Sequence, residues 1–404
     1  MTTPPPWMDD ARCRRIVDAL GAAGGEVRFV GGAVRDLLLG RAWNEVDIAT
    51  TLRPEQTARA LEAAGLKAVP TGIDHGTVTG IADGYAIEIT TLRADVETDG
   101  RHAVVAFSTD WSTDAARRDF TVNALSMTPD GRIHDPLGTG LDDLRARHLR
   151  FIGRAEDRIA EDRLRILRFF RFHAELGWAF LDRAGLDAIA AQRDGLLQLS
   201  AERVWREMRR LLAVPDPVSS LQAMQATGVL AVLLPEAAPV ETVAALPTPD
   251  PQLRLALLAG TADRADQIAR RWKLSVAERE RTVGALVLVE PALFTDRKAA
   301  RAAAWRTGID RFRDRLAIAT ARGVAVPAEI TRMIGTWTPP EFPLGGRDAM
   351  AAGLAPGPAV GEALRAVEDW WIDGDFQADR PACLDRLRTV IRAMESRGSS
   401  PPRG

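Results

Sequence analysis

The sequence predicts an α+β N-terminal third followed by an all-α remainder, and three observations carry this prediction. Short segments in which apolar and polar residues alternate occur before about residue 140, which is the pattern of β-strands. After that point long amphipathic segments dominate, such as EDRLRILRFFRFHAELGW (161–178). The 404 residues also exceed what one compact core holds, so we expect two to four domains.

The first third is expected to alternate helices and strands around two sharp turns. Helices are predicted for residues 9–23 and for AVRDLLLG (33–40), which Gly40 ends. Strands are predicted for EVRFV (26–30), VDIAT (46–50), TVTGI (77–81), YAIEITTL (85–92) and AVVAF (103–107). Asp83-Gly84 marks a tight hairpin turn.

Proline-rich interruptions at 215–217, 235–251 and 338–343 are expected joints between helical subdomains.

The composition excludes several classes of protein. Hydrophobic residues make up 46% and charged residues 27% of the chain, its net charge is −2, and its apolar runs fall short of the ~20 residues of a membrane span. The start, MTTPPPWMDDARCRR, has no apolar stretch typical of a secretory signal. Cys13 and Cys383 are too few and too distant for a disulfide framework or a CxxC site. We therefore expect a cytoplasmic protein without a membrane partner.

Histidine offers no rival metal chemistry. The five histidines form no HxH or HxxxH pattern, and the C-terminal half contains none. A zinc site and an HD-type phosphohydrolase are thereby disfavoured.

Three carboxylates form the first candidate site. Residues i and i+2 of a strand point to the same side, so Glu45 and Asp47 project together while Val46 and Ile48 face the core. In YAIEITTL the same rule turns Glu88 outward. If these strands are neighbours, the three acids converge, and such a cluster suits Mg²⁺ ions that clamp a phosphoryl group in transfer. Taken alone, Glu45 and Asp47 are better explained as acids on a half-exposed strand.

Gly31-Gly32 shifts that balance, because a glycine pair between a strand and a helix lets backbone N–H groups approach an anion. The spacing matches neither the GxGxxG dinucleotide fingerprint nor the GxxxxGK[ST] phosphate loop. Arg35 is a candidate contact to a triphosphate, with Asp36 orienting it. Without the glycine turn, Arg35-Asp36 is more simply explained as a surface pair on a helix.

These residues carry a resemblance. GGAVRDLLLGR (31–41) followed by EVDIAT (45–50) resembles the signature of the class II nucleotidyltransferases, which comprise the tRNA CCA-adding enzymes and bacterial poly(A) polymerases. The resemblance continues in order through five further blocks: IEITTLR (87–93), ARRDFTVNALS (116–126), HDPLGTGLDDL (134–144), FIGRAEDRIAEDRLRILRFFRF (151–172) and LSAERVWREM (199–208). The blocks cover roughly the first half of the chain. Their joint order is far more specific than any single motif.

The resemblance implies a fold and a set of site residues. The fold is a polymerase-β-like nucleotidyltransferase head over residues 1–149, a helical neck over 150–214, and a helical body and tail over 215–404. Glu45, Asp47 and Glu88 become the catalytic and metal-holding carboxylates, for Mg²⁺ with Mn²⁺ as an alternative. The nucleotide-binding set comprises Gly31, Gly32, Arg35, Asp36, Arg117, Arg118, Asp119, Asn123, Asp162, Arg165, Arg168 and Arg171.

The family's EDxxR element matches Glu161, Asp162 and Arg165, and in the family such side chains pair with the base edge of CTP or ATP. The spacing supports this role, because Arg158, Asp162 and Arg165 would share one face of a continuous helix, with Arg168 and Arg171 extending a basic strip. An aspartate accepts from an amino group and an arginine donates to a carbonyl or ring nitrogen, which together fit cytosine. The alternative explanation of these charged residues is a solvent-exposed helix with salt bridges between residues three and four positions apart.

One departure and several alternatives stay open. The family usually has aspartate where Glu45 stands, so we expect retained activity with an altered Mg²⁺/Mn²⁺ preference, and a catalytically weakened RNA-binding protein is the less favoured alternative. In the family, enzymes that add only CC have lost a flexible loop between the third carboxylate and RRDF. This chain keeps a full segment there, residues 93–116, so the resemblance favours CCA addition over CC-only addition. Poly(A) polymerase and A-adding enzyme remain as alternatives. The expected partners are the acceptor and T-arm of tRNA, with CTP and ATP as substrates, and no obligatory protein partner is evident.

Overall fold

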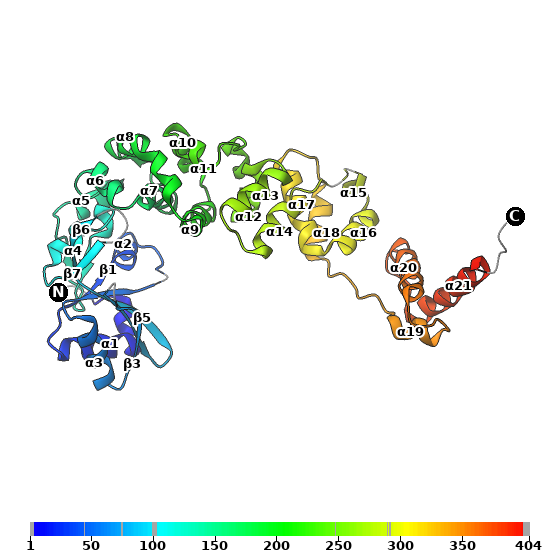
Figure 1. Cartoon of the computed structure of the whole chain (residues 1–404), viewed down its shortest axis with the longest axis horizontal. Helices are drawn as coiled ribbons and strands as arrows, with labels where there is room; N and C mark the ends of the chain where they lie inside the picture. The colour runs from blue at the N-terminus through cyan, green and yellow to red at the C-terminus, as the bar shows by residue number, and fades with distance from the viewer. Residues whose placement is uncertain are drawn as a thin grey trace. The chain divides into compact units, whose positions relative to one another are not determined.

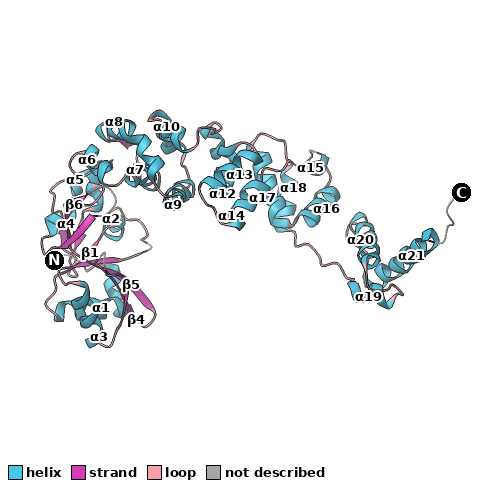
Figure 2. Cartoon of the chain, in the orientation of Figure 1, coloured by secondary structure: helices cyan, strands magenta, loops and turns pink. Residues whose placement is uncertain are grey.

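The computed structural model describes residues 4–43, 45–73, 76–98, 103–246, 248–288, 290 and 292–398. The chain forms two compact units, Met1–Ala237 and Ala238–Gly404. The boundary between the units falls inside the proline-rich stretch 235–251. Among the described residues every strand belongs to the first unit, and the second is helical (Figures 1 and 2). The predicted succession of an α+β part and a helical part is confirmed.

A seven-stranded mixed sheet forms the base of the first unit. Its strand order is β3-β4-β5-β2-β1-β8-β9, and the β2–β5 pair is parallel while the other pairs are antiparallel. The strands are β1 Val27–Val30, β2 Asp47–Thr50, β3 Lys67–Gly72, β4 Thr77–Ala82, β5 Tyr85–Thr91, β8 Ser126–Met127 and β9 Ile133–His134. The register sets Asp47 of β2 directly beside Glu88 of β5.

Helices α1 (Ala11–Ala22) and α3 (Pro54–Ala63) pack together and against β4. The apolar stripe of α1 is buried there, including Ile16 and Leu20, neither of which has exposed surface. Between β4 and β5, Asp83 and Gly84 both have positive φ, 46° and 80°, as a tight two-residue hairpin turn requires. The predicted turn at Asp83-Gly84 is confirmed.

The segment after β5 builds a separate two-stranded sheet rather than extending the main one. Strand β6 (Arg93–Thr98) pairs antiparallel with β7 (Ala103–Phe107). The predicted strand 103–107 is thus confirmed, but its partner β6 was not expected. Residues 99–102 of the full segment 93–116 lie outside the described residues.

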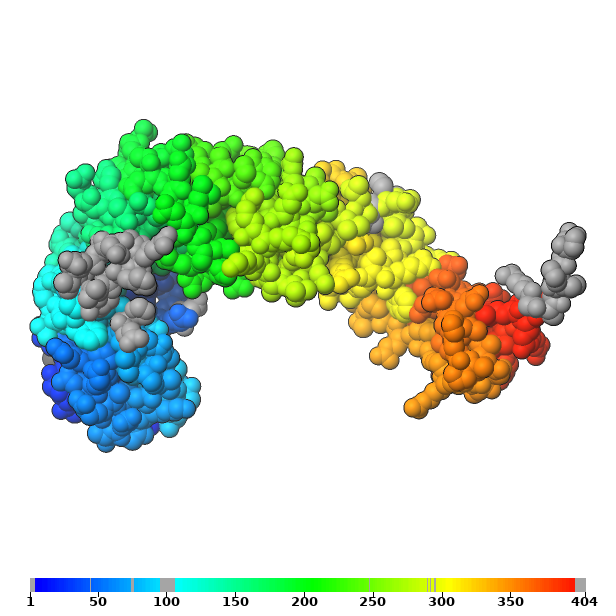
Figure 3. All heavy atoms as spheres, viewed as in Figure 1, coloured from blue at the N-terminus to red at the C-terminus, as the bar shows by residue number. Residues whose placement is uncertain are grey.

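The remainder of the first unit is mostly helical, and its later part, residues 164–233, is green in Figures 1 and 3. Its elements are α2 Gly32–Leu38, α4 Trp111–Ala116, α5 Gly140–Ala146, β10 His148–Leu149, α6 Ala155–Glu161, α7 Leu164–Leu176, β11 Phe180–Leu181, α8 Arg183–Gln192, α9 Ala201–Leu212, α10 Val218–Ala226 and α11 Val229–Leu233. Short 3-10 turns occur at Pro6–Asp9, Thr121–Asn123 and Arg193–Gln198.

An aromatic cluster joins the sheet-bearing part of this unit to helix α7. Phe120 lies between Phe151 and Phe172, with ring centroids 5.0 and 5.5 Å away, and Phe169 stacks on Phe151 at 5.4 Å. Phe120 and Phe169 have no exposed surface. Each buried ring contributes a large apolar area to the core, so this cluster fixes α7 against the ARRDF segment.

The second unit consists of helices packed around apolar cores. Its elements are a 3-10 turn at Val240–Ala245, α12 Pro251–Ala259, α13 Ala262–Arg271, α14 Val276–Gly284, α15 Ala292–Thr295, α16 Arg297–Thr307, α17 Ile309–Ala321, α18 Ala328–Thr336, α19 Gly346–Ala351, α20 Pro358–Asp373 and α21 Arg380–Gly398. One core gathers around Phe312 and Ile334, and another around Trp371 and Leu387. No helix in the described ranges is long and apolar enough to cross a membrane.

Two local expectations are wrong. Strand β2 begins at Asp47, so Glu45 lies in the loop before it, and Ile48, Ala49 and Thr50 are all buried instead of alternating. The helix expected across 161–178 is interrupted. Helix α6 ends at Glu161 and α7 begins at Leu164, because the Asp162 carboxylate accepts from the Leu164 N–H (3.0 Å) and so caps a new helix.

Candidate active site

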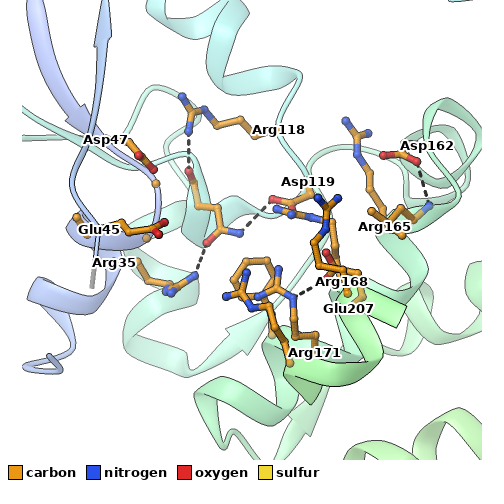
Figure 4. Close-up of a pocket in the computed structure, with 18 of the residues that line it drawn as sticks. Arg35, Glu45, Asp47, Arg118, Asp119, Asp162, Arg165, Arg168, Arg171 and Glu207 are labelled. Atoms are coloured by element: carbon orange, nitrogen blue, oxygen red, sulfur yellow. Dashed lines mark hydrogen bonds and ion pairs between the residues drawn. The ribbon is translucent and has the colours of Figure 1, made fainter. Parts of the chain in front are cut away.

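A cavity of about 950 Å³ opens in the first unit, and nearly all predicted site residues line it. All twelve predicted nucleotide-binding residues belong to its wall, as do the catalytic candidates Glu45 and Asp47. Figure 4 labels these two carboxylates together with Arg35, Arg118, Asp119, Asp162, Arg165, Arg168 and Arg171. Glu88 is not part of the wall; it is exposed and neighbours Asp47 through the β2–β5 register. The structure therefore brings residues from sequence positions 31 to 171 into one concave site.

The carboxylates at one end of the cavity repel one another. Burial, then the charges of Glu88 and Glu45, raises the pKa of Asp47 to about 6, although Arg118 counteracts this rise. A cation bound at Asp47 would favour the charged form of this carboxylate. The loop position of Glu45, before the strand, gives its longer side chain access to the same end of the cavity.

The glycine turn adopts a conformation that only glycine takes readily. Gly31 has φ +70° and ψ −135° and precedes α2, which starts at Gly32. A Cβ atom at Gly31 would lie 3.9 Å from Arg118 Nη1 and 4.0 Å from Asp47 Oδ2, which are ordinary contacts. Backbone conformation, and not lack of space, therefore requires glycine at this position. The turn borders both Arg118 and Asp47.

Asp119 is a buried charge with a complete set of partners. Arg168 donates to its Oδ2 (Nε at 2.7 Å), and Asn123 Nδ2 and the Phe120 N–H donate to its Oδ1 at 3.1 and 2.9 Å. Burial alone would raise the pKa of Asp119, but Arg168 and these donors hold it below its ordinary value. The pair joins the ARRDF segment to helix α7.

Asn123 extends this network to helix α2. Its Oδ1 accepts from Arg35 Nη1 (2.8 Å), and Arg35 also donates to both carboxylate oxygens of Asp36 (2.9 and 3.0 Å). The side chain of Arg35 is buried and lies over the Phe172 ring, 5.0 Å from its centroid. Asp36 and Asn123 thus hold Arg35 in the cavity wall, and the contact of Arg35 with a triphosphate stays a prediction.

The EDxxR element takes up its positions at the break between α6 and α7. Glu161 Oε2 accepts from Arg165 Nη1 (2.5 Å), and Arg165 Nη2 donates to the carbonyl of Arg117 (2.8 Å). Arg165 is therefore held at both ends, by the neighbouring helix and by the ARRDF segment. Asp162 caps α7 and turns its carboxylate to the cavity wall.

Arg168 and Arg171, which the sequence joined in one basic strip, have different surroundings. Arg171 has 1% of its surface exposed and pairs with Glu207 (2.5 Å) and Glu175 (2.6 Å). Its guanidinium lies 4.0 Å from the Phe172 ring centroid. Removing one partner of such a buried pair is strongly destabilising, so Arg171 supports the cavity wall from within.

Helix α9 supplies wall residues that sequence reasoning did not assign. Arg203, Arg206, Glu207 and Arg210 line the cavity, and Arg203 Nη2 donates to both oxygens of Asp162 (3.1 and 2.8 Å). The spacing of these four residues, at i, i+3, i+4 and i+7, was a readable signal for one helix face that begins in LSAERVWREM. What the sequence lacked was any sign that this face meets Asp162.

The carboxylates at this end suit a divalent ion. Among the described residues no three acidic, histidine or cysteine side chains form a ready set of ligands. Mg²⁺ is usually held by one or two carboxylates together with water and substrate phosphates. Glu45 and Asp47 in the wall, with Glu88 beside Asp47, match that kind of donor set.

Comparison with known proteins identifies relatives along most of the chain. Residues 27–150 match the family described as the poly A polymerase head domain, and residues 181–240 match the probable RNA and SrmB-binding site of polymerase A. A mitochondrial CCA tRNA nucleotidyltransferase 1 from Mus musculus is 32% identical over 90% of this chain and 86% of its own length. A CCA-adding enzyme from Streptococcus thermophilus is 31% identical over 94% of this chain and 96% of its own length.

Solved structures agree with this relationship. The Bacillus stearothermophilus CCA-adding enzyme in complex with CTP has a TM-score of 0.79 and 30% identity, covering 97% of this chain and 99% of that protein. The Thermotoga maritima CCA-adding enzyme complexed with tRNA has a TM-score of 0.65 with 20% identity, covering 94% of each chain, which shows a shared fold.

The repulsion at Asp47 predicts that Asp47→Asn stabilises the metal-free protein. The pKa of Asp47 is 3.8 in the unfolded chain and about 6 in the folded protein, so the folded state binds the proton more tightly. The charged carboxylate therefore destabilises the fold at pH above about 6. The penalty is lost as the pH falls through this window toward 3.8. We expect a gain of about 1–2 kcal/mol at pH 8 in EDTA, measured by urea unfolding, and a smaller gain at pH 5.

Asp18→Asn is the matched control, because Asp18 is exposed on α1, away from the cavity. Its expected effect at both pH values is close to zero. A metal-free Asp47→Asn protein that is no more stable than wild type at pH 8 would contradict the repulsion described here.

Proposed function

The chain belongs to the family of CCA-adding tRNA nucleotidyltransferases, and we propose that it adds CMP, CMP and AMP to tRNA 3′ ends within the cavity described above. In each step the RNA 3′-hydroxyl oxygen forms a bond to the α-phosphate of CTP or ATP. The bond from that phosphate to pyrophosphate breaks, and the hydroxyl proton is lost.

One observation carries this proposal. A single cavity has carboxylates and a glycine turn at the β1–β2 end and, in the same wall, the base-reading candidates Asp162 and Arg165. A phosphoryl-transfer centre and a base-selecting surface are the two parts that addition without a nucleic-acid template needs. The related Bacillus stearothermophilus enzyme forms a complex with CTP, which supports the choice of substrate.

The glycine turn and the ARRDF arginines bind the triphosphate in this proposal. The N–H groups around Gly31-Gly32 face an anion at the start of α2, and Arg117 and Arg118 supply positive charge. Arg118 is oriented by Asp114, which accepts from its Nη2 at 3.0 Å. Arg35, which pairs with Asp36 and donates to Asn123, keeps the glycine turn in its conformation. The ion pair between Asp119 and Arg168 holds the ARRDF segment against α7.

Asp162 and Arg165 choose the base. The Asp162 carboxylate accepts from the exocyclic amino group that cytosine and adenine share, and Arg165 donates to a ring nitrogen or carbonyl. Arg203 keeps both Asp162 oxygens in a fixed orientation, so the acceptor is set before the nucleotide arrives. Arg165 is likewise preset by Glu161 and the Arg117 carbonyl.

Glu45 and Asp47 hold divalent metal, which we propose to be Mg²⁺ with Mn²⁺ as an alternative, and Glu88 supports Asp47 as the third carboxylate. When bound there, such ions supply activation of the RNA hydroxyl and neutralise charge that develops on the phosphate. The protein's own contribution is to bring the two carboxylates, the arginines and the glycine turn into one wall.

We assign residues 1–149 to the catalytic head, 150–214 to the neck, and 215–404 to the body and tail that bind the acceptor and T-arm of tRNA. The match of residues 181–240 to an RNA-binding family supports RNA contact near the start of this last part. The cytoplasmic location expected from the sequence stays a prediction, because the relatives include bacterial enzymes and a mitochondrial one.

The direct test supplies the protein with Mg²⁺ and tRNAs that end before C74, after C75, or with the complete terminus. CTP and ATP are given separately and together, and products are resolved to single nucleotides. We expect two C residues and one A, followed by a stop. Long A tails would instead identify a poly(A) polymerase, and addition of A only after CC would identify an A-adding enzyme; either result overturns the proposal.

Glu45→Asp tests the unusual carboxylate. The shorter side chain moves the oxygens back by about one C–C bond, and Mg²⁺ tolerates departures from octahedral geometry poorly. We expect the ratio of activities with Mg²⁺ and Mn²⁺ to change by about threefold or more, while the stop after A is preserved. An unchanged metal dependence would contradict the role given to Glu45.

A further inference from the structure

Helix α9 presents a row of arginines to the cavity, and one of them is unlike the rest. Among the described residues that line the cavity, Arg206 is the arginine for which the structure gives no ion pair, hydrogen bond or ring contact. Arg203 donates to the Asp162 carboxylate, and Arg210 Nη2 forms an ion pair with Glu175 Oε1 at 3.0 Å. Glu207, the acid next to Arg206 in sequence, accepts a hydrogen bond from Arg171.

The surroundings of Arg206 are rich in positive charge. Three of the four residues at three or four positions from it on the helix surface are arginines, Arg203, Arg209 and Arg210, and the fourth is Glu202. Its side chain is exposed while it lines a concave wall. A guanidinium kept without a protein partner at such a place fits an anionic ligand, and phosphate oxygens match its planar donors.

The position along the wall distinguishes between two sources of phosphate. The proposed triphosphate groups, Gly31-Gly32 and Arg118, lie at the carboxylate end, whereas Arg206 is one helical turn from Arg203, the partner of Asp162. Arg206 therefore belongs to the base-reading side. On that side the RNA strand is the other source of phosphate, because its 3′-terminal nucleotide must lie beside the bound CTP or ATP for the 3′-hydroxyl to reach the α-phosphate.

We infer that Arg206 binds a phosphodiester of the last nucleotides of the RNA acceptor strand and so positions the 3′ end for attack. The inference rests on the proposed function and names a subsite within it. Arg206 contacts substrate away from the reacting atoms, so it acts on the affinity for RNA and leaves the binding of CTP unchanged.

The test compares wild type with Arg206→Ala, Arg206→Lys and Arg209→Ala. Arg209 is exposed on the same helix but does not line the cavity. Arg209→Ala therefore removes the same charge as Arg206→Ala and leaves the proposed phosphate subsite in place. Incorporation of CMP is measured on tRNA ending before C74, with tRNA and CTP varied independently at several salt concentrations. Thermal unfolding checks that each variant folds.

We expect Arg206→Ala to raise the KM for tRNA about tenfold, as the loss of a charge-assisted contact implies, with the KM for CTP unchanged. The slope of log(1/KM) for tRNA against log salt becomes shallower by about 0.7, the value for one single-strand phosphate contact. Arg206→Lys recovers part of the loss, and Arg209→Ala stays near wild type.

Replacing one 3′-terminal linkage at a time by a neutral methylphosphonate locates the contact. At the linkage that Arg206 binds, the change weakens wild type and has no further effect on Arg206→Ala. If Arg206→Ala behaves as Arg209→Ala, or if it raises the KM for CTP instead, the inference is wrong even though CCA addition stands. Failure of wild type to extend any tRNA would instead defeat the proposed function.

Discussion

The buried pair between Asp119 and Arg168 is the interaction on which the rest of the site depends. A carboxylate with this little exposure needs a cation and hydrogen-bond donors to remain charged, and it obtains them from α7 and from Asn123. Because Asn123 also holds Arg35, the same charge orders the wall from α2 to α7. The aromatic cluster around Phe120 then makes this contact between segments rigid, since Phe120 directly follows Asp119.

In the proposed function, this arrangement lets one wall serve two kinds of recognition. Positive charge and backbone donors would bind the phosphate groups, and both CTP and ATP offer these groups alike. In the proposed function, Asp162 and Arg165 read the base. Each is held by its own partner, so the protein sets the directions of donor and acceptor. The carboxylates Glu45 and Asp47 are kept apart from the base-reading pair by the arginine segment, which contacts both sides through Arg118 and the Arg117 carbonyl.

The sequence predicted the parts whose cause is local. The strand–glycine–helix turn, the Asp83-Gly84 hairpin and the outward direction of Glu88 follow from backbone preference and alternation, and the structure has them. The break at Asp162 was missed because the apolar pattern of 161–178 continues through it, and only the cap to the Leu164 N–H reveals it. The burial of Arg171 and the reach of Arg203 to Asp162 depend on how α7 packs against α9, which no local pattern encodes.

The proposed roles of Asp162 in base reading and of Arg118 in phosphate binding are tested most directly by one measurement. This is single-turnover incorporation of CTP and UTP onto tRNA lacking C74. It compares wild type, Asp162→Ala and Arg118→Ala. If Asp162 reads the base and Arg118 binds phosphate, Asp162→Ala reduces the preference for CTP over UTP by about tenfold or more. Arg118→Ala then weakens both nucleotides alike and leaves that preference intact. An undiminished preference in Asp162→Ala, or a preference lost in Arg118→Ala, would contradict this account of the site.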